Sequence, residues 1–192
     1  MERQHLITPE QFRTLARPVS AHLDELEVLQ YIDECEMLYI IPAIGYGNYQ
    51  HAVNIPEMEG DESTFDKTFD GTFDDLFEPN IWLNGGEFER CDCGCGGVGE
   101  KDWCVGLRKT LAYFVYARMG RADGNIIARA GYMRHNDQYA DHVYDTQKAY
   151  NDVMNTAETY LAGCLRYAKC HTVDKVIKPV GQSRAKIKAI GD

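Results

Sequence analysis

The sequence lacks a long hydrophobic run. Its longest stretch without Asp, Glu, Lys or Arg covers residues 37–56, and that stretch contains Pro42, Gly45 and Gly47. A segment broken in this way does not fit a membrane span. The opening residues MERQHLITPEQF also lack the basic region and the apolar region of a secretory signal peptide. We therefore expect a protein that is made in the cytoplasm and has no membrane partner.

Common catalytic motifs are missing as well. The chain has no G-x-x-x-x-G-K-[ST], no H-E-x-x-H and no G-x-S-x-G. Its densest polar cluster is RHNDQYADH, in which His135, Asp137, Asp141 and His142 have the chemistry to hold a metal. Such a run is more often a solvated loop in front of a helix. We expect no enzymatic activity and no cofactor.

Basic residues are scarce in most of the chain. The 192 residues contain 20 Lys and Arg against 30 Asp and Glu, a net charge of −10. Residues 172–192 hold five of the basic and two of the acidic residues, so residues 1–171 keep 15 and 28, a net charge of −13. An acidic body repels phosphate, which argues against nonspecific nucleic-acid binding by that part of the chain. The C-terminal tail is basic.

The first half of the chain has helical patterns. Thr8-Pro9-Glu10-Gln11 predicts a capped helix that ends near Arg17, because Pro18 follows. A longer helix is expected over residues 20–41, ended or kinked by Pro42, with GYGNYQ as a loop after it. Its expected apolar face is Leu23, Leu26, Ile32, Cys35, Met37, Leu38 and Ile41, and its expected outer face carries Asp24, Glu25, Glu34 and Glu36.

Two further helices close the expected fold. One covers about 102–119 and is broken at 120–124, and the other covers about 145–170. The second has a continuous apolar stripe made of Tyr150, Val153, Met154, Ala157, Tyr160, Leu161, Cys164, Leu165 and Ala168. After His171 the pattern stops, and Pro179-Val180-Gly181 ends any helix. The fold class is mainly α: a small helical bundle (1–171) with a hairpin or loop excursion in the middle (57–105) and an extended C-terminal tail (172–192).

The excursion contains a short repeat of Thr-Phe-Asp. Phe65, Phe69, Phe73 and Phe77 are four residues apart, which predicts an amphipathic helix that docks on the body. A calcium loop is the alternative, but it needs acidic ligands two residues apart rather than four. Asn84-Gly85-Gly86 is a turn signal, and EFERCDC fits one strand of an exposed hairpin.

The stretch CDCGCGGVG (91–99) allows three interpretations. It matches G-x-G-x-x-G, but neither an apolar strand nor a βαβ pattern surrounds it, so we reject a dinucleotide loop. Zinc has four candidate ligands in Cys91, Cys93, Cys95 and Cys104, although C-x-C spacing is less suitable than C-x-x-C. We favour a structural hairpin or loop over Cys91–Cys104 that protrudes and makes contacts between subunits or between rings. The seven cysteines are expected to be thiols unless the protein leaves the cell.

Three segments together resemble the head–tail connector (adaptor) proteins of tailed bacteriophages, of the type found in phages of Bacteroides-type hosts, including crAss-like phages. They are ITPEQFRTLARPVSAHLDELEVLQYIDECEMLYIIPAIG, GLRKTLAYFVYARMG and RHNDQYADHVYDTQKAYNDVMNTAETYLAGCLRYA. The similarity covers most of residues 7–170. It rests on degenerate helical patterns, with a variable middle.

The resemblance implies a structural virion protein at the head–tail junction, made in the bacterial host cytoplasm. Such proteins form a homo-oligomeric ring, usually a dodecamer, that joins the portal to neighbouring tail or ring proteins. DNA passes through the lumen without sequence-specific binding, and an acidic wall suits that passage. Apolar residues that lie outside a single buried helical stripe suit contacts between subunits. The residues that suggest such a surface here are Tyr113, Tyr116, Tyr144 and Tyr167. The alternative is a zinc-stabilised or nucleic-acid-binding helical regulatory protein of phage origin.

The tail is expected to order only on assembly. It offers apolar anchors and basic side chains that it cannot bury by itself. The expected partner-binding residues are Val176, Ile177, Arg184, Lys186, Ile187, Lys188 and Ile190, and their expected partner is the portal.

Overall fold

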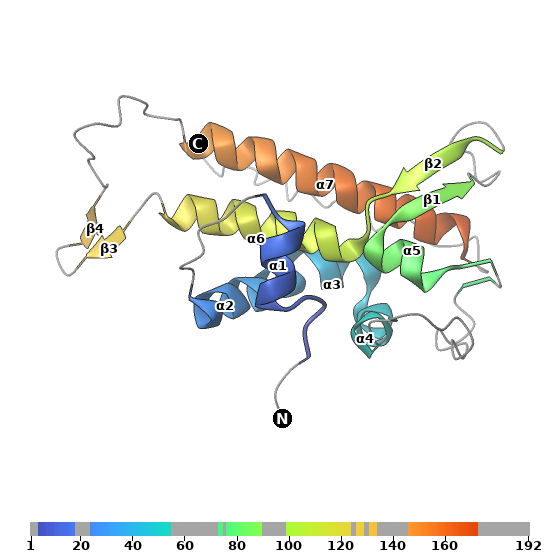
Figure 1. Ribbon diagram of the computed structural model, residues 1–192, viewed down its shortest axis with the longest axis horizontal. Coiled ribbons are helices and arrows are strands. Elements are labelled where there is room, and N and C mark those ends of the chain that lie inside the picture. The colour runs from blue at the N-terminus through green and yellow to red at the C-terminus, as the bar shows by residue number, and fades with distance from the viewer. Residues whose placement is uncertain are drawn as a thin grey trace, which may run out of the picture.

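The computed structural model describes residues 4–17, 24–54, 73–74, 76–89, 99–123, 126–128, 131–133 and 146–172. These residues form a mostly helical fold with two short hairpins (Figure 1). The expected fold class, a small mainly-α fold, is therefore confirmed. Within these ranges no helix is both long enough and apolar enough to cross a membrane.

The elements are arranged along the chain in a simple order. They are α1 (Pro9–Leu15), α2 (Glu25–Cys35), the π-helical turn η1 (Glu36–Ile40), α3 (Ile41–Ile44), α4 (Tyr46–Asn54), α5 (Pro79–Asn84), β1 (Gly86–Glu89), β2 (Lys101–Cys104), α6 (Leu107–Asp123), β3 (Ile126–Ala128), β4 (Gly131–Met133) and α7 (Thr146–Cys170).

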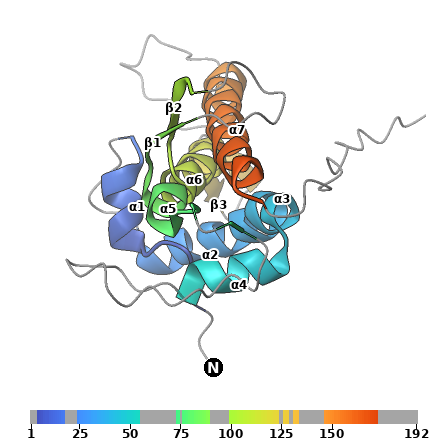
Figure 2. The same cartoon turned by 90° about the vertical axis from the view of Figure 1, so that its right-hand side faces the viewer.

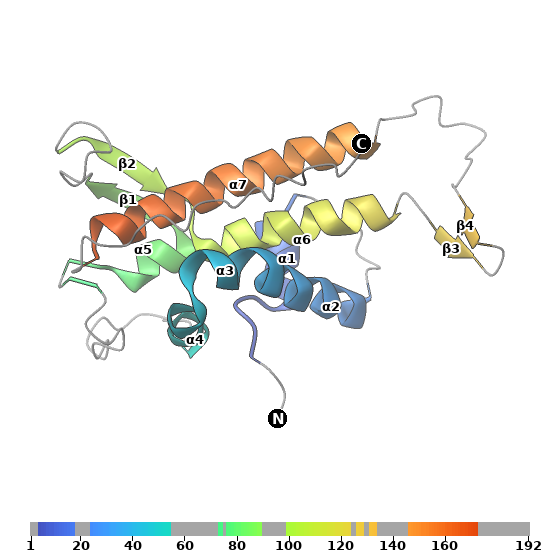
Figure 3. The same ribbon diagram turned by 180° about the vertical axis from the view of Figure 1, so that it is seen from behind.

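Helix α6 is the centre of the fold. Helix α7 runs antiparallel along one side of it, and α1 and α2 pack on other sides, as the end-on view (Figure 2) and the view from behind (Figure 3) also show. A helix surrounded in this way needs apolar residues around most of its circumference. Its buried residues are Leu107, Thr110, Leu111, Ala112, Phe114, Val115, Ala117 and Met119.

Two of the expected helices are confirmed closely. At α1 the Thr8 hydroxyl accepts from the Gln11 amide at 3.2 Å, and the Thr8 amide donates to the Gln11 side chain at 2.9 Å, which makes the expected capping box. Helix α7 begins one residue after the expected start and ends at Cys170 as expected. Its buried face includes Val153, Ala157 and Cys164 from the predicted stripe.

The expected long helix differs from the structure in its register. Leu26, Met37 and Leu38 were assigned to the apolar face but are exposed, whereas Glu36 was assigned to the outer face and is fully buried. In the second half, Glu36 lies four residues after buried Ile32 and eight after buried Val28, so a regular helical period already places it on the core face and places Met37 and Leu38 away from that face. In the first half, Val28 rather than Leu26 precedes buried Ile32 on the core face.

The expected loop after Pro42 is also wrong. Pro42 lies in the first turn of α3, where its missing N–H costs little, so the helix continues to Ile44. Gly45, at φ +82°, separates α3 from α4, and GYGNYQ belongs mostly to α4. The burial of Tyr49 in the core outweighs the weak helix propensity of this segment.

The middle of the chain forms the expected hairpin and also part of the core. Strands β1 and β2 pair antiparallel, with Gly86 opposite Cys104 and Glu89 opposite Lys101. Residues 102–104 are therefore strand, not the start of a helix, because pairing with β1 fixes them as extended chain. Buried residues contributed by α5 and the hairpin are Trp82, Leu83, Phe88 and Cys104.

Two other expectations, one for the Phe repeat and one for the end of α6, are wrong. Phe73 and Phe77 do pack on the body, but Phe73 forms a β-bridge with Thr172 rather than part of a helix. Phe65 and Phe69 lie outside the described residues. Helix α6 continues through Gly120 to Asp123 instead of breaking there, and β3 and β4 then form a hairpin that we did not expect.

Candidate functional site

The first candidate is a set of exposed apolar side chains along α2, η1 and α4. Leu26, Met37, Leu38 and Tyr46 have exposed fractions of 70%, 57%, 51% and 65%. We call these four residues the outer apolar surface. Exposed large apolar side chains that cluster on one part of a protein surface mark a site where another molecule docks.

The same turn that exposes Met37 and Leu38 buries a carboxylate. Glu36 is fully buried, and one of its oxygens accepts the backbone amide of Leu6 at 2.7 Å. Its other oxygen accepts the Tyr49 hydroxyl at 2.7 Å and contacts His5 Nδ1 at 2.9 Å. We call this cluster the Glu36 anchor. It joins the segment before α1, the π turn and α4 through one side chain.

The Glu36 anchor also contains a group with metal-binding chemistry. Ligand atoms of His5, Asp33 and Glu36 lie within 4.8 Å of one another. Both oxygens of Glu36, however, already accept hydrogen bonds from protein donors. A buried carboxylate needs such donors in order to remain charged. These hydrogen bonds explain the burial of Glu36 as part of a structural anchor.

The π turn itself can be explained by Pro42. Proline has no N–H to donate, and its ring clashes with the carbonyl four residues earlier. The wider turn moves the carbonyls apart, and the Ile41 amide bonds to the Glu36 carbonyl, five residues back. The turn is held on α6 by Tyr39, whose ring stacks on Phe114 with centroids 4.4 Å apart and planes 6° apart.

Burial changes the acid–base behaviour around this turn. Loss of contact with water raises the pKa of Tyr39, and the neighbouring Tyr150 raises it further. Burial likewise raises the pKa of the Cys35 thiol to about 12. Nearby, Arg118 on α6 forms an ion pair with Glu34 on α2. Cys35 and Tyr39 therefore stay protonated at neutral pH.

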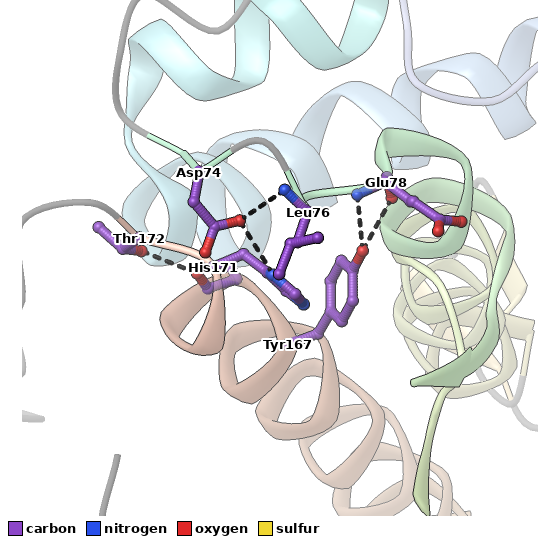
Figure 4. Close-up of polar contacts among 7 residues, drawn as sticks. Asp74, Leu76, Glu78, Tyr167, His171 and Thr172 are labelled. Carbon is purple, nitrogen blue, oxygen red and sulfur yellow. Dashed lines mark hydrogen bonds and ion pairs between the residues drawn. The ribbon is translucent and has the colours of Figure 1, made fainter. Parts of the chain in front are cut away.

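The second candidate is a polar cluster at the C-terminus of α7 (Figure 4). His171 Nδ1 lies 3.1 Å from an oxygen of Asp74, and the same oxygen accepts the Leu76 amide at 3.0 Å. The Asp74 amide donates to the His171 carbonyl at 2.7 Å. The Tyr167 hydroxyl accepts the Glu78 amide at 2.8 Å. We call this cluster the C-terminal clasp.

Aromatic rings support the clasp from inside. Phe73 stacks on Phe77 with centroids 3.9 Å apart, and Phe77 packs against Trp82 and Tyr167, both at 5.6 Å. Burial raises the pKa of Tyr167 well above its ordinary value. Tyr167 was expected to lie beyond the buried stripe, and this expectation is wrong because its ring is 1% exposed.

The structure near the clasp shows that the C-terminal tail begins later than expected. Thr172 was assigned to the tail, yet it is buried, it bridges to Phe73, and its hydroxyl donates to the Ala168 carbonyl at 2.7 Å. Thr172 therefore belongs to the folded body, because Phe73 offers it a pairing partner. The tail residues proposed to bind a partner come after it in the chain, and all of them lie outside the described residues.

The cysteine cluster is separated in the structure. Cys104 is fully buried, and its sulfur lies 3.7 Å from that of Cys164 on α7. Cys104 therefore has no part in a protruding contact, which corrects our expectation for this residue. Cys91, Cys93 and Cys95 lie outside the described residues, as do Tyr144 and the polar run 134–142. Tyr113 and Tyr116 are half-buried against the core.

Sequence reasoning missed the Glu36 anchor and the clasp. A signal for the first was present, because Glu36 follows Val28 and Ile32 at four-residue steps and so lies on the apolar face of a regular helix. The clasp had no such signal, since Asp74 and His171 are 97 positions apart.

The chain was also compared with known proteins. No protein-family model matches it, and searches of curated proteins and of solved structures find no significant match.

Proposed function

We propose that this chain is a structural, non-enzymatic subunit of a phage head–tail connector ring, which joins the portal to the tail and surrounds the DNA conduit. The resemblance of most of residues 7–170 to connector proteins suggests the kind of assembly. One structural observation supports it most: large apolar side chains are exposed on several parts of the molecule, and the outer apolar surface and β2 are two of them.

A closed ring of identical subunits needs two different faces, because each copy contacts the next head to tail. The outer apolar surface supplies one candidate face through Met37 and Leu38. The other is Trp103 on β2, which is 63% exposed. Strand β2 lies along α7, whereas α2 and η1 lie on another side of the central helix α6 (Figures 1 and 3). In the proposed ring, the hairpin of one copy contacts the outer apolar surface of its neighbour.

Charge is consistent with the same role. Residues 1–171 carry a net charge of −13, with 15 basic and 28 acidic residues. A conduit for DNA benefits from negative walls, since phosphates do not adhere to them during packaging and ejection. The portal and the adjoining tail or ring proteins are the proposed partners of the assembled ring, and the basic tail is the proposed contact with the portal.

The Glu36 anchor gives the proposed interface a fixed shape. Met37 and Leu38 come directly after Glu36, so the donors that hold its carboxylate also hold the backbone of the exposed pair. A side chain that is already in its bound position loses less conformational entropy on association. Such preorganisation suits a permanent assembly.

The two-face arrangement can be tested by mixing variants and measuring particle mass by mass photometry. M37E/L38E should lose one face and W103E the other, so each should be monomeric where the parent chain forms rings. An equimolar mixture should contain heterodimers and no larger particle, because each pair uses the one intact face of either partner. L76E changes a side chain that is 74% exposed and belongs to neither face, so it should still form rings.

Other results would reject specific parts of the proposal. Rings formed by M37E/L38E or by W103E would show that the altered face is not used. A mixture that stays monomeric would show that the two faces do not contact each other. Stoichiometric zinc in the purified protein, with unfolding on chelation, would favour the zinc-stabilised alternative.

A further inference from the structure

Two cysteine sulfurs meet in the core between the hairpin and α7. Cys104 is the last residue of β2 and Cys164 lies in the second half of α7. Both are fully buried free thiols, and their sulfurs are 3.7 Å apart, although 60 residues separate them in the chain. We propose that Cys104 and Cys164 are an oxidation site that closes to an intramolecular disulfide and covalently joins the hairpin to α7.

The backbone around the pair allows this bond. A disulfide has an S–S length of about 2.05 Å, so the sulfurs must approach by only about 1.7 Å. Gly163, next to Cys164, has no side chain, and a Cβ placed there would lie 4.0 Å from the carbonyl oxygen of Trp103, next to Cys104. The two chain segments are therefore already close, and small side-chain rotations can supply the remaining movement.

The hydrogen bonds at the pair assign different roles to the two sulfurs. Cys104 donates to the sulfur of Cys164, and this bond lowers the pKa of Cys164 despite its burial, with help from the Thr110 hydroxyl. The same bond, together with burial, raises the pKa of Cys104. Cys164 is therefore the nucleophile, since the thiolate and not the thiol attacks an oxidant.

The proposed oxidant is a peroxide, because a small uncharged molecule can reach a buried pair. The Cys164 thiolate attacks one oxygen of hydrogen peroxide, the O–O bond breaks, and the released hydroxide takes up the proton that Cys164 lost, giving water and a sulfenic acid. The Cys104 sulfur then attacks the sulfenic sulfur. The S–O bond breaks, and the hydroxyl leaves with the Cys104 proton as a second water. Two thiols and one peroxide thus give one disulfide and two waters.

Peptide mapping of the full chain tests the proposal without any substitution. The folded protein is treated with increasing hydrogen peroxide, its remaining thiols are alkylated, and it is digested with trypsin without reduction. Cleavage at Lys and Arg places Cys104 in peptide 102–108 and Cys164 in peptide 149–166, and neither peptide contains another cysteine. The expected result is a peroxide-dependent link between these two peptides that disappears on reduction.

Stability provides the second measurement. Cross-linking residues that are 60 positions apart restricts the unfolded chain, so oxidation should raise Tm by about 5–10 °C. C104A and C164A should each lose this rise. C35S should keep it, since Cys35 is a buried thiol outside the pair.

Two results would overturn the proposal. One is full alkylation of peptides 102–108 and 149–166 after a peroxide treatment that oxidises peptide 91–101, which carries three cysteines. The other is a link that forms only in urea, because this would show that the folded geometry does not direct it.

Discussion

The backbone amide of Leu6 donates a 2.7 Å hydrogen bond to the buried carboxylate of Glu36, 30 positions further along the chain. This bond holds the N-terminal segment against a π turn whose next two residues are exposed Met37 and Leu38. Fold stability and the proposed interface therefore depend on the same side chain.

Removing that carboxylate should be costly. Glu36→Ala leaves the Leu6 amide and the Tyr49 hydroxyl buried without their acceptor, and we expect it to lower the free energy of unfolding by about 3–5 kcal/mol. Glu36→Gln keeps the shape and one acceptor oxygen and should lose roughly 1–3 kcal/mol. Urea unfolding followed by circular dichroism measures both. Glu27→Gln, an exposed change on α2, should stay within about 0.5 kcal/mol of the parent. Equal stability of Glu36→Ala and this control would contradict the anchor.

The clasp makes stability sensitive to high pH. Because burial raises the pKa of Tyr167 above about 10, its ordinary value, the folded chain keeps a proton that the unfolded chain releases. The contribution of protonated Tyr167 to the free energy of unfolding is complete below about pH 10 and is lost as the pH rises further. Tyr167→Phe has no hydroxyl to ionise. It should be about 1 kcal/mol less stable at neutral pH, through loss of the Glu78 bond, and its stability should fall less steeply as the pH rises above about 10. Parallel pH profiles for the two proteins would contradict this role.

The tail can be removed at a defined residue. A chain ending at Thr172 should keep the stability of the full chain, since the clasp is intact, and should form rings but bind portal weakly. A chain ending at His171 also loses the bridge to Phe73 and the bond to Ala168, so it should be less stable. Unfolding curves and portal pull-downs at several salt concentrations measure these effects.

Two further tail variants separate charge from apolar contact. Replacing Ile177, Ile187 and Ile190 by Ser should weaken portal binding at every salt concentration. Replacing the five basic residues of 172–192 by Gln should weaken it mainly at low salt, where charges are least screened. Full portal binding by the chain that ends at Thr172 would show that the tail is not a contact.

Sequence patterns predicted those parts of the fold that depend on interactions between residues close together in the chain. The capping box at Thr8 depends on residues three apart, and the stripe of α7 depends on steps of three and four, so both can be read from the sequence. Glu36 was placed on the outer face because it is charged, and Met37 on the core face because it is apolar, and both placements were wrong. Glu36 follows Ile32 by four residues and Val28 by eight, so helical spacing alone puts it on the core face.

The polar clusters could not be found in this way. Cys104 was grouped with its neighbours in CDCGCGGVG, although its contact is Cys164 on a distant helix. Asp74 and His171 meet only because Phe73, in the last Thr-Phe-Asp repeat, pairs with Thr172 shortly after the end of α7. These contacts depend on the tertiary fold, and no spacing in one sequence reveals them.

Electron microscopy of the purified full-length chain, alone and mixed with the portal protein of the same phage, tests the connector proposal most directly. We expect closed rings of identical subunits, most often with twelve copies, stacked coaxially on the portal, in which the β1–β2 hairpin of one copy contacts Met37 and Leu38 of the next. Particles that remain monomeric at high concentration, both without and with portal, would contradict the proposed function.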